Sequence, residues 1–118
     1  MAVTVLIVDD HASFRRAARA LLELEGYAVV GDAENVQDGV AAARDLRPDL
    51  LLVDVGLPDG DGFEVAERLR DDEARPPAIV FTSNRDATGF AQRIATCGGA
   101  GFVAKHELTG QALAELLA

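Results

Sequence analysis

Residues 50–62 read Leu-Leu-Leu-Val-Asp-Val-Gly-Leu-Pro-Asp-Gly-Asp-Gly, an apolar run that ends in an acid and then in turn-forming residues. The run Leu50–Val53 is too short for a typical helix and is apolar throughout, which predicts a strand buried on both faces. Asp54 follows it directly, and Gly56 and Pro58 favour a turn after it. The stretch therefore predicts a central strand with a carboxylate at its carboxyl end.

Four other short apolar runs have the length and composition of strands. Two of them are apolar almost throughout, as an interior strand must be, and two are shorter and accompanied by Gly or Ala, as edge strands can be. The interior candidates are Val3–Val8 and Ala78–Phe81, and the edge candidates are Ala28–Val30 and Phe102–Ala104.

Amphipathic stretches separate these runs and predict helices. Asp61 and Glu64 have the spacing of a capping box, which predicts a helix from there through Leu69. The other predicted core stripes are Phe14, Ala17, Leu21 and Leu24 before Gly26; Val36, Val40 and Ala43 between Asn35 and Pro48; Ala87, Phe90, Ile94 and Cys97 before Gly98; and Leu108 with Leu113 around a capping Thr109.

Strands that alternate with helices imply parallel pairing through right-handed crossovers, with helices on both faces of the sheet. Three interior and two edge strands fit the order 2-1-3-4-5, the flavodoxin-like doubly wound α/β fold, here written (βα)5. The order 3-2-1-4-5 is less favoured, because it would bury the weak second strand.

Length and charge limit the classes of protein. The chain has 118 residues, which suits a single domain over residues 1–118. Its formal net charge of −9 disfavours direct contact with nucleic acid, and no apolar run reaches the length of a membrane span. Cys97 is the single cysteine and cannot form an internal disulfide, so we expect a cytoplasmic protein.

Polar side chains follow four of the predicted strands. Asp9 and Asp10 follow the first strand, Asp54 the third, Thr82 the fourth and Lys105 the fifth. In doubly wound sheets the ligand site lies outside the carboxyl ends of the strands, where the strand order reverses. We therefore expect carboxylates, a hydroxyl and an ammonium group to converge there.

Three converging carboxylates repel one another unless a cation joins them. Oxygen ligands suit Mg²⁺, and Asp9 and Asp10 are the candidates to hold it. Asp54 would contribute one oxygen and act as nucleophile toward a phosphoryl group, with Lys105 and Thr82 neutralising the transferred oxygens. Each residue alone has an ordinary explanation, as a helix cap, a turn acid, a strand end or a surface lysine. Their joint occurrence at four strand ends favours phosphoryl transfer.

The sequence resembles the receiver domains of bacterial two-component response regulators, the CheY-like superfamily. The resemblance spans nearly the whole chain and is carried by Val-Asp9-Asp10, by residues 50–62, by Ile-Val-Phe-Thr82-Ser83 and by Gly-Ala-Gly-Phe102-Val-Ala-Lys105. It implies a regulatory phosphoacceptor domain, with Asp54 as acceptor and a histidine kinase as phosphodonor. It also implies that Mg²⁺ is held by Asp9, Asp10, Asp54 and the Gly56 carbonyl.

The resemblance further implies a conformational switch through Thr82 and Phe102. The surface of the fourth helix, fifth strand and fifth helix would then change its affinity for an output domain or partner protein, or for a second copy in a phosphorylation-dependent homodimer.

This sequence departs from the common family pattern at two positions. Phe102 stands where many members have tyrosine, and His106 stands where many have proline after the lysine. A cis bond after Lys105 would cost about 3–4 kcal/mol without proline, so the loop geometry is left open. Regulators of the NarL/LuxR type often lack that proline, which suggests transcription regulation through a DNA-binding helix-turn-helix domain outside this chain.

Two other functions fit part of the pattern. A magnesium-dependent phosphatase could use Asp54 as nucleophile, but Gly56 stands where the common aspartyl-phosphatase pattern has a second acid. A pseudo-receiver that never carries phosphate usually lacks an acid or the lysine, and this chain has both.

Overall fold

The computed structural model describes residues 2–72, 76–84 and 89–117. Its main sheet is parallel and has the strand order β2-β1-β3-β6-β7, which corresponds to the predicted 2-1-3-4-5. The flavodoxin-like fold is therefore confirmed. The strands are β1 (Thr4–Val8), β2 (Ala28–Ala33), β3 (Leu50–Asp54), β6 (Ala78–Ser83) and β7 (Gly101–Ala104).

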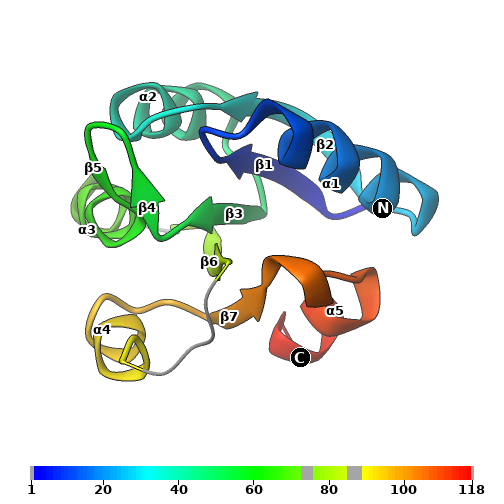
Figure 1. Ribbon diagram of the computed structural model, residues 1–118. Coiled ribbons are helices and arrows are strands. Elements are labelled where there is room, and N and C mark those ends of the chain that lie inside the picture. Colours follow the sequence, from blue (N-terminus) through cyan, green and yellow to red (C-terminus); the bar gives the residue numbers. More distant parts are fainter. Residues whose placement is uncertain (1, 73–75, 85–88, 118) are drawn as a thin grey trace.

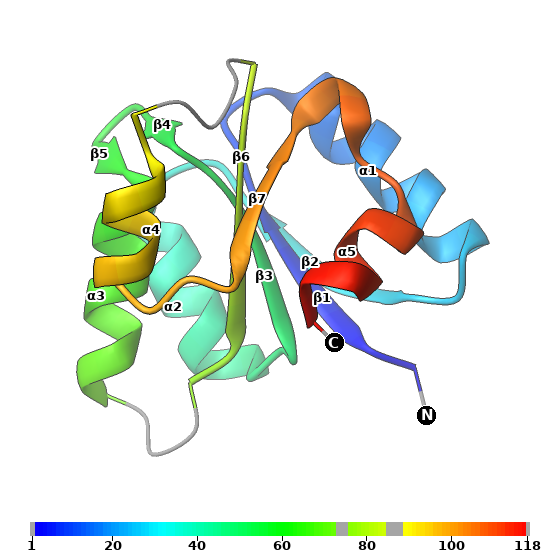
Figure 2. The same ribbon diagram turned by 90° about the horizontal axis from the view of Figure 1, so that it is seen from below.

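Helices cover both faces of this sheet (Figures 1 and 2). On one side lie α1 and α5, and on the other lie α2, α3 and α4, as Figure 2 shows. The helices are α1 (Ala12–Leu24), α2 (Val36–Leu46), α3 (Gly62–Asp72), α4 (Ala91–Thr96) and α5 (Gly110–Leu117), with a 3₁₀ turn η1 at Lys105–Glu107.

Alternation along the interior strands divides the core into two layers. In β3, Leu51 and Val53 pack into the layer under α2, α3 and α4, whereas Leu50 and Leu52 pack into the layer under α1 and α5. All four side chains are buried, as the apolar run predicts. The sheet is thus fixed by apolar contact on both faces, which holds the strand ends in place.

Side-chain caps mark three helix starts, of which those at Asp61 and Thr109 were predicted. The Asn35 side chain accepts from the Asp38 amide at 2.7 Å, and the Thr109 hydroxyl accepts from the Ala112 amide at 3.0 Å. Asp61 Oδ1 accepts from the Glu64 amide at 2.9 Å, which is one half of the predicted capping box. The starts of α2, α3 and α5 are therefore fixed by side chains that lie three residues before the amides they accept from.

The predicted stripe on the first helix was partly wrong. Leu24 is 88% exposed and Ala17 is exposed, whereas Ala18 and Leu22 are buried against the sheet. The helix therefore packs on the sheet through a different face from the one predicted. The position Ala87 of the predicted fourth-helix stripe lies outside the described residues.

A two-stranded antiparallel hairpin that the sequence did not predict follows β3. It consists of β4 (Gly56–Leu57) and β5 (Gly60–Asp61) and leads directly into α3, as Figure 1 shows. Both Asp59 carboxylate oxygens accept backbone amides at the start of α2, from Val36 at 2.7 Å and Gln37 at 3.1 Å. The hairpin is thereby anchored to a neighbouring helix.

Candidate functional site at the carboxyl edge of the sheet

The predicted site residues meet at one edge of the sheet. Asp54 ends β3 and pairs in register with Thr82 of β6, while Asp9 follows β1 and Lys105 follows β7. All of these strands are parallel, so their carboxyl ends lie on the same side. The structure thus brings together the side chains that the sequence analysis selected.

Lys105 bridges two buried carboxylates. Its Nζ lies 2.7 Å from Asp9 Oδ2 and 3.0 Å from Asp54 Oδ2, and its side chain is only 8% exposed. The ammonium also lies 4.8 Å from the centre of the Phe14 ring, whose face attracts a cation. Burial alone would lower the lysine pKa, but the hydrogen bonds and charges of the two carboxylates outweigh it, so the pKa of Lys105 is raised. The lysine is therefore held in its charged form.

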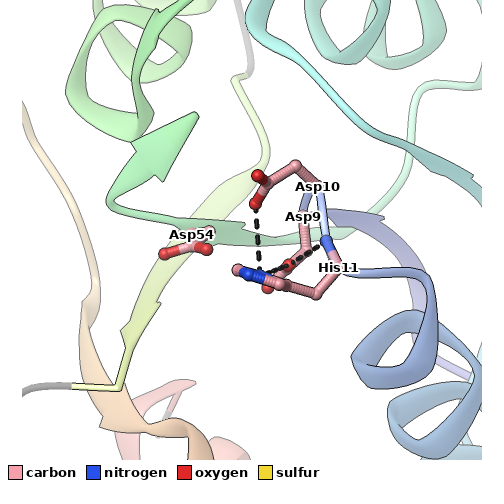
Figure 3. Close-up of side chains that lie close together, drawn as sticks. All are labelled: Asp9, Asp10, His11 and Asp54. Carbon is pink, nitrogen blue, oxygen red and sulfur yellow. Dashed lines mark hydrogen bonds and ion pairs between the residues drawn. The ribbon is translucent and has the colours of Figure 1, made fainter. Parts of the chain in front are cut away.

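The carboxylates form a compact cluster with one histidine. One ligand atom each from Asp9, Asp10, His11 and Asp54 lies within 4.8 Å of the others. Figure 3 shows these four side chains lying close together. Asp9 and Asp54 are buried, whereas Asp10 is exposed. Burial, followed by the negative charge of Asp9, raises the pKa of Asp54 despite the hydrogen bond from Lys105. The ionised cluster is therefore short of positive charge.

This donor set fits a hard divalent cation. Carboxylate oxygens are the ligands that Mg²⁺ prefers, and a single lysine does not balance three aspartates. Asp9, Asp10 and Asp54 could hold the ion. The Gly56 amide donates to Asp54 Oδ1 at 3.3 Å, which places this residue beside the cluster, and the role of its carbonyl stays a prediction.

Thr82 and Phe102 occupy different parts of the site. The Thr82 side chain is fully buried, and its hydroxyl has no hydrogen-bond partner among the described residues. Phe102 is half-buried on β7 and stacks on Phe90 with ring centroids 6.2 Å apart. The Thr82 hydroxyl is thus free to bind a group that enters beside Asp54.

The sequence analysis missed two residues. The Nδ1 atom of His11 lies 3.1 Å from Asp9 Oδ1, 3.2 Å from Asp10 Oδ1 and 3.4 Å from Lys105 Nζ. Arg15 Nη1 donates to the Asp9 carbonyl oxygen at 2.6 Å. The signal for both was their position within six residues of Asp9, on the turn and first part of the helix that follow β1.

The structure shows the conformation of the peptide bond after Lys105. No cis peptide bond occurs in the described part of the chain, so the Lys105–His106 bond is trans. His106 is exposed and lies 3.6 Å from Glu107 Oε1. The second histidine therefore takes no part in the cluster.

The fold and the site agree with a family-wide sequence pattern described as the response regulator receiver domain, which matches residues 5–117. Because this match covers nearly the whole chain, the chain belongs to the response regulator receiver domain family. In the described part of the chain, no helix is both long and apolar enough to cross a membrane.

Curated relatives of this chain are transcriptional regulators. The chain is 42% identical over 103 residues to the virulence-factor transcription regulator BvgA of Bordetella pertussis, covering 87% of this chain and 49% of BvgA. It is 39% identical over 87 residues to the KDP operon transcriptional regulatory protein KdpE of Escherichia coli, covering 74% of this chain and 38% of KdpE. The chain thus spans about half, or less, of the length of these relatives.

Solved structures of the same family superpose over almost the whole chain. The receiver domain of the response regulator NarL from Mycobacterium tuberculosis has a TM-score of 0.85 at 29% identity, covering 99% of this chain and 98% of that one. A LuxR-family response regulator from Aurantimonas sp. SI85-9A1 has a TM-score of 0.86 at 28% identity, covering 99% and 86%. The resemblance to NarL/LuxR-type receivers agrees with the sequence analysis.

Proposed function

We propose that this domain is a phospho-accepting switch, in which Asp54 receives a phosphoryl group from the phosphohistidine of a histidine kinase. The observation that carries the proposal is the position of the Asp54 carboxylate. It lies 3.0 Å from the Lys105 ammonium, inside a cluster of carboxylates at the strand ends. A regulatory domain of this kind catalyses only its own phosphorylation and dephosphorylation and is not otherwise an enzyme.

In this proposal an Asp54 oxygen attacks phosphorus, the new O–P bond forms, and the P–N bond to the donor imidazole breaks. Lys105 neutralises one oxygen of the transferred group, and the buried Thr82 hydroxyl donates to another. Asp9, Asp10, Asp54 and the Gly56 carbonyl would hold Mg²⁺, which supplies positive charge beside the transferring oxygens.

The switch in this proposal starts at Thr82. Movement of its hydroxyl toward the phosphoryl group frees space beside β7, and Phe102 follows it inward. Phe102 is already half-buried and stacks on Phe90, which immediately precedes α4. The α4–β7–α5 surface then changes its affinity for a partner, as a population shift between two states.

The partner chemistry follows from the family and the relatives. We propose an output domain of the DNA-binding helix-turn-helix type, a transcriptional role in the cytoplasm, and a phosphorylation-dependent homodimer. The relatives that extend beyond the matched region are named as transcriptional regulators. With a net charge of −9, this domain is a poor candidate for contacting DNA itself.

The test is phosphorylation of the purified domain by acetyl phosphate or phosphoramidate in Mg²⁺, followed by intact-mass spectrometry. We expect one phosphoryl adduct on the wild type and none on Asp54→Asn. Asp45→Asn, which removes an exposed carboxylate from α2, is the matched control and should keep the adduct. An Asp54→Asn protein that is labelled as fully as the wild type, or a wild type that no donor labels, would contradict the proposal. Multiple turnover on phosphoesters would favour a phosphatase instead.

A further inference from the structure

His11 offers a nitrogen ligand at a cluster whose other candidate metal ligands are carboxylate oxygens. Its Nδ1 lies 3.1 Å from Asp9 Oδ1 and 3.2 Å from Asp10 Oδ1, and Asp54 contributes an oxygen to the same cluster within 4.8 Å (Figure 3). A neutral imidazole nitrogen can bind a metal ion, and this one lies within 3.2 Å of two carboxylate oxygens that can bind the same ion. A metal ion placed among these atoms would have one nitrogen and several oxygens within reach as ligands.

The position of the imidazole is set by the backbone. His11 precedes α1, and its amide donates to Asp9 Oδ1 at 2.8 Å, so the residue is tied to the carboxylate that its own ring contacts. The ring is 57% exposed, which leaves it room to adjust around an ion. A separate sign that the pocket takes a ligand is the fully buried Thr82 hydroxyl beside Asp54 in the β3–β6 register, which has no partner in the described part of the chain.

We propose that His11 is a nitrogen ligand for divalent transition-metal ions of the Zn²⁺ and Ni²⁺ type at this site. This inference rests on the proposed metal site and concerns which ions it accepts. Zn²⁺ and Ni²⁺ bind imidazole well, whereas Mg²⁺ takes oxygen ligands and retains its waters. The site therefore holds Mg²⁺ through carboxylates and binds the transition-metal ions through carboxylates plus the His11 imidazole.

The consequence is a difference in metal selectivity. Replacing His11 removes a ligand from bound Zn²⁺ but removes nothing from bound Mg²⁺. We expect His11→Gln to weaken Zn²⁺ binding by roughly tenfold or more, which corresponds to about 1.4 kcal/mol. Mg²⁺ binding should change by less than about threefold, because the oxygen ligands are retained.

The experiment is isothermal titration calorimetry of the folded domain with Mg²⁺ and with Zn²⁺, for the wild type, His11→Gln and His106→Gln. His106 is exposed and pairs with Glu107, and it is not part of the Asp9, Asp10, His11 and Asp54 cluster, so His106→Gln controls for Zn²⁺ binding to any surface histidine. A second readout is the imidazole ¹⁵N spectrum, in which Zn²⁺ should shift the His11 ring signals and leave those of His106 in place. Circular dichroism checks that each variant is folded.

Equal weakening of Mg²⁺ and Zn²⁺ in His11→Gln, or no weakening of Zn²⁺, would overturn the inference, as would an unshifted His11 ring. These results are separable from failure of the proposed function. If Zn²⁺ affinity is unchanged while Mg²⁺ still supports labelling of Asp54, the His11 inference is wrong and the phosphoacceptor proposal stands. If the wild type neither binds Mg²⁺ nor accepts phosphate, the proposed function itself fails.

Discussion

Neutralising Asp54 should stabilise the metal-free domain, because the fold places this carboxylate among like charges. The Asp9, Asp10 and Asp54 ligand atoms lie within 4.8 Å of one another, and at an effective dielectric of about 20 each such repulsion is about 3.5 kcal/mol or more. At the same dielectric, the attraction between Asp54 and Lys105 at 3.0 Å is about 5.5 kcal/mol. Because Asp10 is exposed, water weakens its repulsion of Asp54, while burial of Asp54 adds a desolvation cost that the hydrogen bonds from Lys105 and Gly56 do not fully offset.

Taken together, these interactions make the ionised Asp54 carboxylate lower the free energy of unfolding of the metal-free domain by roughly 1–2 kcal/mol. Asp54→Asn keeps the shape of the side chain and removes the charge, while Lys105 keeps Asp9 at 2.7 Å. We therefore expect the melting temperature of the variant in a chelating buffer to rise by about 3–8 °C, as scaled for a domain of this size. Thermal melts followed by circular dichroism measure this. Asp45→Asn, an exposed change of the same net charge, should shift the melting temperature far less.

The pH dependence gives an independent check on the sign. The pKa of Asp54 is raised above 3.8, so the ionised form is less favourable in the folded chain than in the unfolded chain. The cost is absent below the unfolded pKa of 3.8, grows as the pH rises from 3.8 to the folded pKa, and is complete above the folded pKa. The difference in melting temperature between Asp54→Asn and the wild type should therefore become smaller as the pH falls from about 7 toward 3.8.

Adding Mg²⁺ should reverse the order of stability. At a concentration of about 100 times Kd, an ion that binds only the folded state stabilises the wild type by about 2.7 kcal/mol. The Asn variant, which lacks one ligand charge, should gain less. A variant that melts below wild type in chelator, or a gap that stays constant across the pH range, would refute the reasoning.

Three further outcomes are expected from the packing. Gly62→Ala should destabilise by about 1–3 kcal/mol in urea denaturation, since its Cβ would lie 2.5 Å from the Asp54 carbonyl oxygen, whereas the control Gly56→Ala meets nothing within 4 Å and should be nearly neutral. Leu113→Ala, at a side chain with 0% exposure, should cost about 2–5 kcal/mol by the same assay, and a loss below about 1 kcal/mol would contradict its place in the core. Asp59→Asn should lower the melting temperature at neutral pH, because the amides at the start of α2 hold the pKa of Asp59 below 3.8. That difference is complete above 3.8 and should shrink as the pH falls below it, and a difference that grows in acid would count against the cap.

Local sequence was enough to predict the elements and the sheet order. The apolar run at 50–53 has to be buried on both faces, so it predicts a central parallel strand, and caps such as Asn35 and Thr109 mark helix starts through bonds within three residues. The carboxyl ends of parallel strands share one edge, so the convergence of Asp9, Asp54, Thr82 and Lys105 followed from the order of the strands. These inferences depend on the spacing of apolar residues and on capping residues that lie close together in the chain, and both can be seen in the sequence.

Tertiary packing alone decided how the helices are rotated and which side chains reach the site. Leu24 lies on a plausible apolar stripe yet is 88% exposed, because contact with the sheet selects Ala18 and Leu22 instead. His11 was not among the predicted site residues, but the turn between β1 and α1 places its ring beside two carboxylates. The physical reason is that a side chain's contacts depend on backbone direction and on distant segments, and neither is encoded in the spacing of residue types along the chain.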